Sequence, residues 1–249
     1  MGLVRYLGGK GKGRLAKQLL SHMLPHRRVG QLWVEPFCGM GGVLKHVPNP
    51  RLACDINPYL IEFLCAARDG WEPPEELTEA EYRRIREFPD ENRPLTAFAG
   101  FGCSFGGKWF GGYARDAQGI NFAAQSLRSV RKWAPRLAGT FIRCEDYHQL
   151  AMPPASFVYC DPPYAGTTTY GGTDSFDHEM FAAWANRIAK QGHTVFVSEL
   201  NALSPNWECV FEKERAMNTS LRGEAPRKFD RLYRVHPASG VGAAGVGAA

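Results

Sequence analysis

The stretch FVYCDPPYAG at residues 157–166 ends an apolar run on an aspartate, two prolines and a tyrosine. Neither Pro162 nor Pro163 has an N–H, and each proline pushes the residue before it away from helical angles. No regular element can therefore continue through the pair. The stiff turn can direct the Asp161 carboxylate and backbone carbonyls into one small space, which the flat ring of Tyr164 can cover. These groups suit a planar amine such as the exocyclic NH₂ of a nucleobase.

Such an amine needs help to react, because its lone pair is delocalised into the ring. Two hydrogen-bond acceptors increase the electron density on the nitrogen and stabilise the positive charge that develops as a methyl group is transferred. This is the mirror image of an oxyanion hole, which stabilises negative charge. The predicted catalytic residues are Asp161, Pro162, Pro163 and Tyr164.

A second candidate site lies earlier in the chain, in VEPFCGMGGV at residues 34–43. Gly39 and Gly41 let the backbone approach a ligand closely after a strand that ends at Glu35. Asp55 ends the next apolar run, where an acid can accept both hydroxyls of a ribose. There is no G-x-x-x-x-G-K-[ST] motif, and acids on both sides of the turn disfavour a pyrophosphate. The expected cofactor is S-adenosylmethionine.

The elements that must position these residues alternate along the chain. We expect strands in residues 31–37, 51–57, 140–146, 156–160, 193–200, 207–216 and 230–237, and helices after Gly13 and in residues 59–69, 121–138 and 177–192. This rhythm predicts an α/β fold with a parallel sheet.

Residues 70–120 interrupt the rhythm. One helix is expected in the acidic segment 71–91, followed by GFGCSFGGKWFGGYARDAQG at residues 100–119. That second segment has no clear period and is too long for an ordinary connection, which is typical of functional or mobile segments. In the helix that follows, Leu127, Val130, Ala134 and Leu137 form the apolar stripe, and Arg128, Lys132 and Arg136 lie on another face.

Composition narrows the class of protein. The chain has 249 residues, a net charge of +5 and 44% hydrophobic residues, which allows a sizeable core and permits a polyanionic partner. No apolar run suits a membrane span, and the N-terminus lacks the core of a signal peptide. Its seven cysteines form no C-x-x-C pair, which disfavours a disulfide framework or zinc site and favours a cytoplasmic protein.

Three motifs in this order, YLGGK, EPFCGMGGV and DPPY, resemble those of the Dam-type (D12-class) DNA adenine-N6 methyltransferases. The resemblance covers residues 4 to about 237. It implies a doubly wound, Rossmann-like S-adenosylmethionine-dependent methyltransferase sheet with an antiparallel final hairpin. It also implies a catalytic domain in residues 1–69 and 139–237 and a target-recognition insert in 70–138. The tail in 238–249 lies outside the resemblance, and its low complexity predicts disorder.

The family also implies a substrate and roles for single residues. The partner is double-stranded DNA, from which one adenine is flipped; no metal or membrane is involved, and a monomer is expected. Donor-binding roles fall on Tyr6, Lys10, Glu35, Pro36, Phe37, Gly39, Gly41, Asp55, Asp146 and Asp161. DNA-binding roles are predicted from residue chemistry, namely cations and aromatics on a glycine-flexible loop, a basic helix face and a basic N-terminal segment: Arg5, Lys108, Tyr113, Arg115, Arg128 and Lys132. Lys10 would lie near the donor's carboxylate, Asp55 at its ribose and Asp146 at its adenine amino group.

The sequence departs from the family in two places. Cys38 and the bulky Met40 change the wall of the glycine turn, and the insert lacks the FN-rich segment typical of enzymes that read GATC. The resemblance therefore does not carry over the target sequence, nor whether the enzyme serves a restriction–modification system.

Two alternatives remain open from sequence. One is methylation of another planar amine, in RNA or on protein glutamine, although such enzymes more commonly have Asn before PPY, and SPPY would suggest N4-cytosine. The other is a nucleic-acid-binding protein with a catalytically dead methyltransferase fold. Lys10, Asp55 and Asp161 argue against the second alternative.

Overall fold

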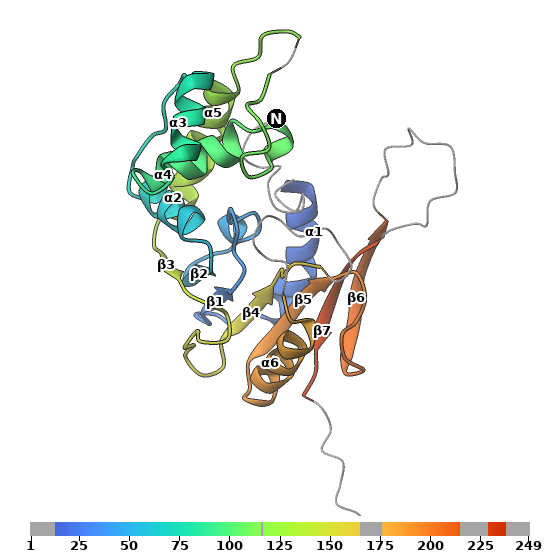
Figure 1. Cartoon of the computed structure of the whole chain (residues 1–249). Helices are drawn as coiled ribbons and strands as arrows, with labels where there is room; N and C mark the ends of the chain where they lie inside the picture. The colour runs from blue at the N-terminus through green and yellow to red at the C-terminus, as the bar shows by residue number, and fades with distance from the viewer. Residues whose placement is uncertain (1–12, 116, 165–175, 215–228, 238–249) are drawn as a thin grey trace, which may run out of the picture.

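The computed structural model describes residues 13–115, 117–164, 176–214 and 229–237, which form one seven-stranded sheet flanked by helices (Figure 1). The strands are β1 Trp33–Glu35, β2 Arg51–Asp55, β3 Thr140–Cys144, β4 Phe157–Cys160, β5 Thr194–Glu199, β6 Trp207–Glu214 and β7 Phe229–Val235, in the order β3-β2-β1-β4-β5-β7-β6. The first five are parallel, and β7 runs antiparallel to both β5 and β6. The expected α/β fold with an antiparallel final hairpin is confirmed.

Both faces of the central strands β1, β4 and β5 are buried, as is typical of parallel sheets. Helices α1 (Gly13–Met23) and α2 (Pro58–Arg68) pack on one face, and α6 (His178–Lys190) packs on the other. On the first face Trp33 stacks on Phe157 with ring centroids 4.7 Å apart, and Phe157 stacks on Phe196 at 5.4 Å. Val34 and Val158, which alternate with these rings along their strands, belong to the core under α6.

Two helices begin close to the carboxyl ends of strands because the sequence supplies caps there. Asn57 accepts hydrogen bonds from the amides of Tyr59 and Leu60, and Pro58 occupies the first turn of α2, where its missing N–H costs nothing. Asp177 caps α6 in the same way, with Oδ1 2.8 Å from the amide of Met180. The cap Asn57 lies two residues beyond Asp55, so α2 begins three residues after the end of β2.

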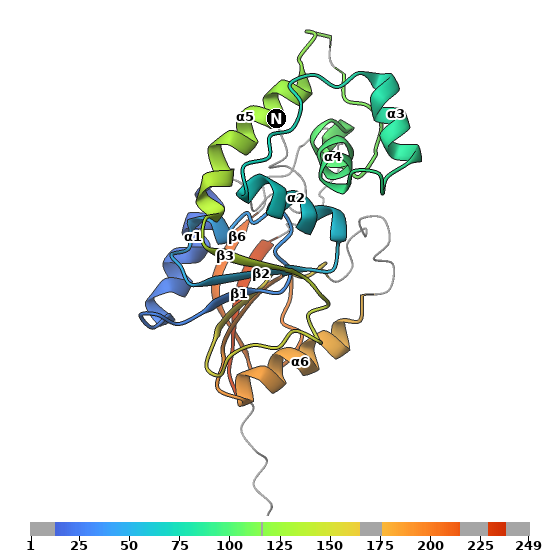
Figure 2. The ribbon, with the colours of Figure 1, turned by 90° about the vertical axis from the view of Figure 1, so that its left-hand side faces the viewer.

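A second group of helices lies beyond α2, away from the sheet (Figure 2). It consists of α3 (Glu79–Glu87), α4 (Arg93–Ala97), the π-helix η4 (Phe98–Gly102), the 3-10 turn η5 (Phe105–Gly107), α5 (Phe122–Trp133) and the 3-10 turn η6 (Ala134–Leu137). A capping box between Thr78 and Glu81 starts α3. Leu127, Val130 and Leu137 are buried, as their spacing predicted. Two further 3-10 turns, η2 (Leu24–His26) and η3 (Leu44–His46), complete the described elements.

The glycine- and aromatic-rich segment 100–119 has regular structure in its described residues, although its sequence shows no clear period. It contains part of η4, all of η5, and a β-bridge that joins Ser104 to Tyr113. Trp109 and Phe110 pack toward the hydrophobic core, with the Trp109 ring 4.5 Å from that of Phe101. The reason is Gly100: a Cβ there would lie only 2.6 Å from the Trp109 ring and 2.9 Å from the Phe110 ring, so only glycine leaves room for both.

None of the helices in the described part of the chain is both long and apolar enough to cross a bilayer.

We expect Gly100→Ala to destabilise the fold by roughly 1–3 kcal/mol, because the added methyl group overpacks the seat of Trp109 and Phe110. Thermal unfolding followed by circular dichroism measures the loss. Adding Trp109→Ala to Gly100→Ala should cost less than the sum of the two single changes, because the ring that the methyl group meets is gone. Strict additivity of the two changes would show that they do not share this contact.

Candidate active site

The pairing of β1 with its two neighbours brings distant parts of the sequence to one edge of the sheet. Val34 is in register with Leu52 of β2 and Val158 of β4, all running in the same direction. The carboxyl ends of the three strands are therefore adjacent, and each ends at or just before an acid: Glu35, Asp55 and Asp161. In open parallel sheets this edge is where ligands bind.

The glycine turn after β1 folds onto the end of β2. The amide of Gly39 donates to Asp55 Oδ2 at 2.9 Å, and the amide of Asn57 donates to Oδ1 at 3.0 Å. Gly39 and Gly41 both have positive φ angles, +48° and +62°, which explains the need for glycine at each. Burial raises the pKa of Asp55, while the amides of Asn57 and Gly39 act in the opposite direction. Each carboxylate oxygen has a second lone pair available for a ligand hydroxyl.

Glu35 is 3% exposed and accepts a hydrogen bond from Trp33 Nε1 at 2.9 Å. Burial raises its pKa to about 8; the Trp33 hydrogen bond lowers the pKa, and the negative charge of Asp161 raises it further. Glu35 is therefore mostly protonated at pH 7. This neutral state reduces the repulsion that two adjacent carboxylates would otherwise exert on each other.

The end of β4 carries the DPPY string. Pro162 is buried, and Asp161, Pro163 and Tyr164 are half-buried. Two residues before Asp161, on the same face of the strand, the hydroxyl of Tyr159 lies 2.9 Å from that of Ser198 on β5. This buried pair stiffens the strand end from which the turn departs.

Acids also stand at the ends of the outer parallel strands. Asp146 follows β3, and its Oδ1 lies 2.6 Å from the His148 ring and 3.2 Å from the His148 amide. Glu199 ends β5, is fully buried, and accepts a hydrogen bond from the Leu200 amide at 2.5 Å. An acidic residue thus ends or follows each of the five parallel strands, and those that are ionised favour a cationic ligand such as a sulfonium.

Comparison of the sequence with known proteins shows which family this chain belongs to. The model of the D12 class N6 adenine-specific DNA methyltransferases matches residues 6–92 and 108–214. The chain belongs to this family. It is 27% identical over 208 residues to the retron Ec67 DNA adenine methylase of Escherichia coli, covering 72% of each chain. It is 25% identical over 219 residues to the DNA adenine methylase of Escherichia coli strain K12, covering 79% of this chain and 74% of that one.

Among solved structures, the chain is similar to a methyltransferase named yhhF from Escherichia coli, with 9% identity, a TM-score of 0.39, and coverage of 90% of this chain and 85% of that chain. This similarity is too distant to identify the fold. The fold follows instead from the strand order and strand directions of the sheet. As a D12-class methyltransferase, the chain methylates adenine in DNA with S-adenosylmethionine as methyl donor.

The residues at the carboxyl edge fit that donor. The oxygens of Asp55 lie at the end of β2 and keep acceptor capacity for a ribose. Next to Asp55, the apolar side chain of Ile56 is 63% exposed, which sequence alone did not indicate. The sequence did contain a signal: Ile56 lies between Asp55, at the end of a strand, and the helix cap Asn57. An apolar residue at such a position is outside the buried part of the strand. Phe37 packs against Tyr147, Phe176 and Phe181 at 5.0–5.8 Å on the α6 side of the edge.

The predicted DNA-binding residues, together with the donor-binding residues Tyr6 and Lys10, fall into three groups. Arg5, Tyr6 and Lys10 lie outside the described residues. Lys108, Arg128 and Lys132 are exposed on the helical group that lies beyond α2.

Tyr113 and Arg115 form the third group, because both have partners within the protein. Tyr113 donates its hydroxyl to the Leu77 carbonyl at 2.6 Å, and Arg115 forms an ion pair with Glu79. Arg115 is 65% exposed and has five N–H donors, so a contact with DNA could add to the Glu79 pair or replace it.

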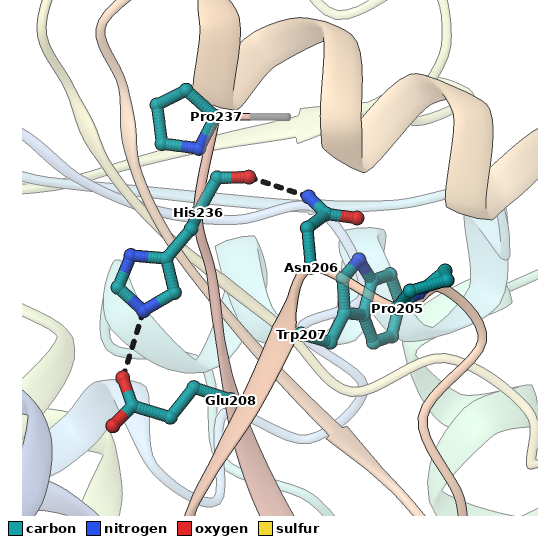
Figure 3. Close-up of a pocket in the computed structure, with 6 residues that line it drawn as sticks. All are labelled: Pro205, Asn206, Trp207, Glu208, His236 and Pro237. Atoms are coloured by element: carbon teal, nitrogen blue, oxygen red, sulfur yellow. Dashed lines mark hydrogen bonds and ion pairs between the residues drawn. The ribbon is translucent and has the colours of Figure 1, made fainter. Parts of the chain in front are cut away.

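A pocket of about 280 Å³ lies at the opposite edge of the sheet, lined by Pro205, Asn206, Trp207, Glu208, His236 and Pro237 (Figure 3). Val235 pairs with Val195 near the amino end of β5, which places this pocket far from the DPPY turn. His236 Nε2 lies 2.7 Å from Glu208 Oε2, so these two side chains of the pocket already pair with each other.

The described residues contain no cluster of three potential metal ligands.

The raised pKa of Glu35 predicts a pH dependence of stability. The unfolded chain loses the Glu35 proton near pH 4.5, whereas the folded chain keeps it until about pH 8. Wild type should therefore lose stability on this account as the pH rises from about 4.5 to about 8. Glu35→Gln has no proton to lose, so its free energy of unfolding relative to wild type should rise across this window by roughly 2–5 kcal/mol.

Thermal or urea unfolding of both proteins without donor, at several pH values from 4.5 to 8.5, measures this difference. Taking the difference between the proteins cancels the titration of the other groups. A difference that stays constant with pH would show that Glu35 is ionised in the folded protein.

Proposed function

We propose that this D12-class enzyme methylates one adenine within a specific duplex sequence, and that the adenine leaves the base stack to reach the DPPY turn. The observation that carries the proposal is the position of Asp161. It follows β4, and one strand away the glycine turn is hydrogen bonded to Asp55. A methyl donor seated on that turn would lie beside the carboxylate, at a depth that an amine within the stack cannot reach.

The cofactor's contribution is an electrophilic methyl group on a sulfonium. The chain's part is to bind and to orient. We propose that Asp55 accepts the ribose hydroxyls, that Ile56 covers one face of the adenine ring, and that Phe37, Gly39 and Gly41 line the pocket. Pro36 and the neutral Glu35 would close its floor, and Asp146 would accept from the adenine amino group. Tyr6 and Lys10, which the family resemblance assigns to the donor, complete the proposed set.

For the target base, Asp161 and the carbonyl of Pro162 are the proposed acceptors for the two N6 hydrogens, and Tyr164 the stacking partner. When the nitrogen bonds to the methyl carbon, the carbon–sulfur bond of the donor would break and leave its electron pair on sulfur. The nitrogen would then carry a positive charge, which Asp161 would stabilise. The same carboxylate is the nearest acceptor for the proton that nitrogen then loses. Pro163 keeps the turn stiff, so that little reorganisation accompanies the reaction.

DNA reading is proposed for residues 70–138, with residues 1–69 and 139–237 as the catalytic domain. The apolar face of α5 is buried against its neighbours, and Arg128 and Lys132 point to solvent one turn apart. Two lysine or arginine side chains at this spacing suit phosphate contacts, which position a duplex without reading its sequence. Arg5, Lys108, Tyr113 and Arg115 are the other proposed DNA contacts.

The proposed setting is a monomer in a reducing cytoplasm. All seven cysteines have free thiols in the structure, and burial raises the pKa of the Cys38 and Cys160 thiols, which keeps both protonated and unreactive. Such an enzyme does not depend on an oxidising compartment.

We expect Asp161→Ala to lower the rate of methyl transfer at saturating donor and DNA by about 10²–10³, because it removes an acceptor that acts mainly in the transition state. Single-turnover transfer of tritiated methyl groups to duplex DNA measures the rate, and thermal unfolding checks the fold. Asp69→Ala, which removes an exposed carboxylate paired with Arg68, is the matched control and should leave the rate unchanged. A near-wild-type rate for Asp161→Ala would refute the proposed role.

Arg128→Ala and Lys132→Ala should each weaken binding to cognate and scrambled duplexes equally. Each should also reduce the slope of log affinity against log salt by about 1, since one phosphate contact is lost. Fluorescence anisotropy from low to moderate salt measures both effects. Lys190→Ala, at the end of α6 near the amino edge of the sheet, should keep the wild-type slope. If the two α5 variants also keep it, α5 does not contact the DNA backbone.

A further inference from the structure

Four basic side chains from three elements lie together on the face of the sheet that carries α1 and α2. Lys17 is on α1, Lys45 and His46 are on the 3-10 turn η3, and Arg136 is on η6. Arg136 Nη1 lies 3.5 Å from His46 Nδ1. Burial lowers the pKa of His46, and the positive charges of Lys45, Arg136 and Lys17 each lower it further. These four side chains, here called the basic cluster, are therefore close in space although they are far apart in sequence.

The backbone that carries the basic cluster is held in place by Arg51, the first residue of β2. The Arg51 guanidinium donates to the Leu44 carbonyl of η3 at 2.9 Å and to the Arg136 carbonyl of η6 at 2.8 Å. Arg51 is 4% exposed, so a buried group holds the two turns side by side. The basic cluster is thus tied to the amino end of β2, and not to the carboxyl edge where the donor is proposed to bind.

The described residues give the basic cluster donors but no acceptor to match them. A guanidinium can only donate, so the neutral His46 ring accepts at Nδ1 and carries its proton on Nε2. His46 Nε2 is buried and has no hydrogen-bond partner in the described part of the chain. The half-buried Lys45 ammonium likewise has no hydrogen bond or ion pair with any described residue.

Acidic groups do not offset this positive charge. Burial and the charge of Arg136 lower the pKa of Lys45, and the one acid of the described structure that acts in the opposite direction is Glu35. Glu35 is mostly protonated at pH 7 because burial raises its pKa to about 8. An anion would supply the missing acceptors and reduce the repulsion among the cations.

The surroundings of the basic cluster indicate which anion it binds. Exposed cations recur every four residues, at Arg128, Lys132 and Arg136, and so lead along α5 into the cluster. Helix α5 itself runs from the outer part of the helical group down to the sheet (Figure 2). Cations spaced along an element in this way suit successive phosphates of a nucleic-acid backbone, which a small free anion would not require.

The basic cluster also lies at a distance from the target base that a duplex can span. β2 has five residues and covers about 17 Å between its amino end and Asp55. Phosphates along one strand of B-DNA are about 3.4 Å apart in the direction of the helix axis. A phosphate at the basic cluster would therefore lie roughly five base pairs or more from the adenine at the DPPY turn.

We propose that Lys17, Lys45, His46 and Arg136 bind a backbone phosphate of the duplex, on one side of the target adenine. This contact extends the DNA-binding surface from the insert onto the catalytic domain. The phosphate accepts hydrogen bonds from the basic cluster and neutralises its charge, which accounts for cations that have no ionised acidic partner among the described residues. The inference rests on the proposed function, since it continues the DNA contact proposed for α5.

The test measures the affinity of Lys45→Met for duplexes that contain an adenine site which sequencing shows wild type to methylate. Methionine keeps the length of the side chain and removes its charge. On a duplex with about 12 base pairs on each side of the target, the variant should bind roughly 3- to 10-fold more weakly at about 0.15 M salt. Its slope of log affinity against log salt should be smaller by about 1.

Shortening the duplex shows where along the DNA the contact lies. Cutting one flank to about 3 base pairs should weaken binding by wild type roughly 3- to 10-fold and binding by Lys45→Met less than about 2-fold, because the phosphate in question is then absent. Cutting the other flank should affect both proteins alike. Arg136→Gln, which changes an exposed side chain, should behave as Lys45→Met does.

Lys190→Met is the matched control, because it removes an exposed ammonium group from α6 on the opposite face of the sheet. It should keep the wild-type affinity and salt slope on every duplex. Thermal unfolding and donor binding check that each variant is folded. Wild-type affinity and slope in both Lys45→Met and Arg136→Gln would overturn the inference, as would an equal loss on the long duplex and on both shortened ones.

NMR titration of the His46 ring distinguishes the DNA backbone from a free anion. Duplex DNA should raise the pKa of His46, since a nearby phosphate favours the imidazolium. If inorganic phosphate raises this pKa and duplex DNA does not, the assignment to the DNA backbone is wrong. If Arg128→Ala lowers the salt slope while Lys45→Met does not, the contact proposed for α5 stands and this inference alone fails.

Discussion

The parallel pairing of β1 with β2 and β4 is the constraint on which the rest of the site depends. Trp33 stacked on Phe157 and Val34 buried on the other face fix the register of the central strands. A slip by one residue would turn each of these side chains to the opposite face, so the register is strongly specified. With that register, Glu35, Asp55 and Asp161 reach one edge although they are far apart in sequence.

The carboxyl groups at this edge of the sheet differ in their hydrogen bonds and in their protonation. Asp55 is held by two backbone amides and is suited to hydroxyl groups, whereas Glu35 is kept largely neutral by burial. A neutral Glu35 leaves Asp161 as the charged member of the pair, which suits the proposed role of Asp161 toward the reacting amine. The ionised acids at this edge would also favour a donor that carries a positive charge.

Much of the fold and site could be predicted because the signals are local. The Pro162-Pro163 turn, the glycine turn and the strands that precede them are each encoded within a few residues. Both turns follow parallel strands, and ligands bind at the carboxyl ends of such strands. The packing of Trp109 into the space at Gly100 could not be predicted, because it depends on a contact between two segments of irregular sequence. The protonation of Glu35 depends on burial from both faces and was equally hidden.

The central claim is that the acidic edge and the DPPY turn act together to methylate N6 of adenine in DNA. The most direct measurement is mass spectrometry of nucleosides after the purified chain has reacted with duplex DNA and a donor carrying a trideuterated methyl group. The account predicts N6-trideuteromethyl-adenine as the labelled nucleoside, formed in the presence of EDTA. Label on cytosine N4, label only when RNA replaces DNA, or no labelled nucleoside with a folded, donor-binding protein would contradict it.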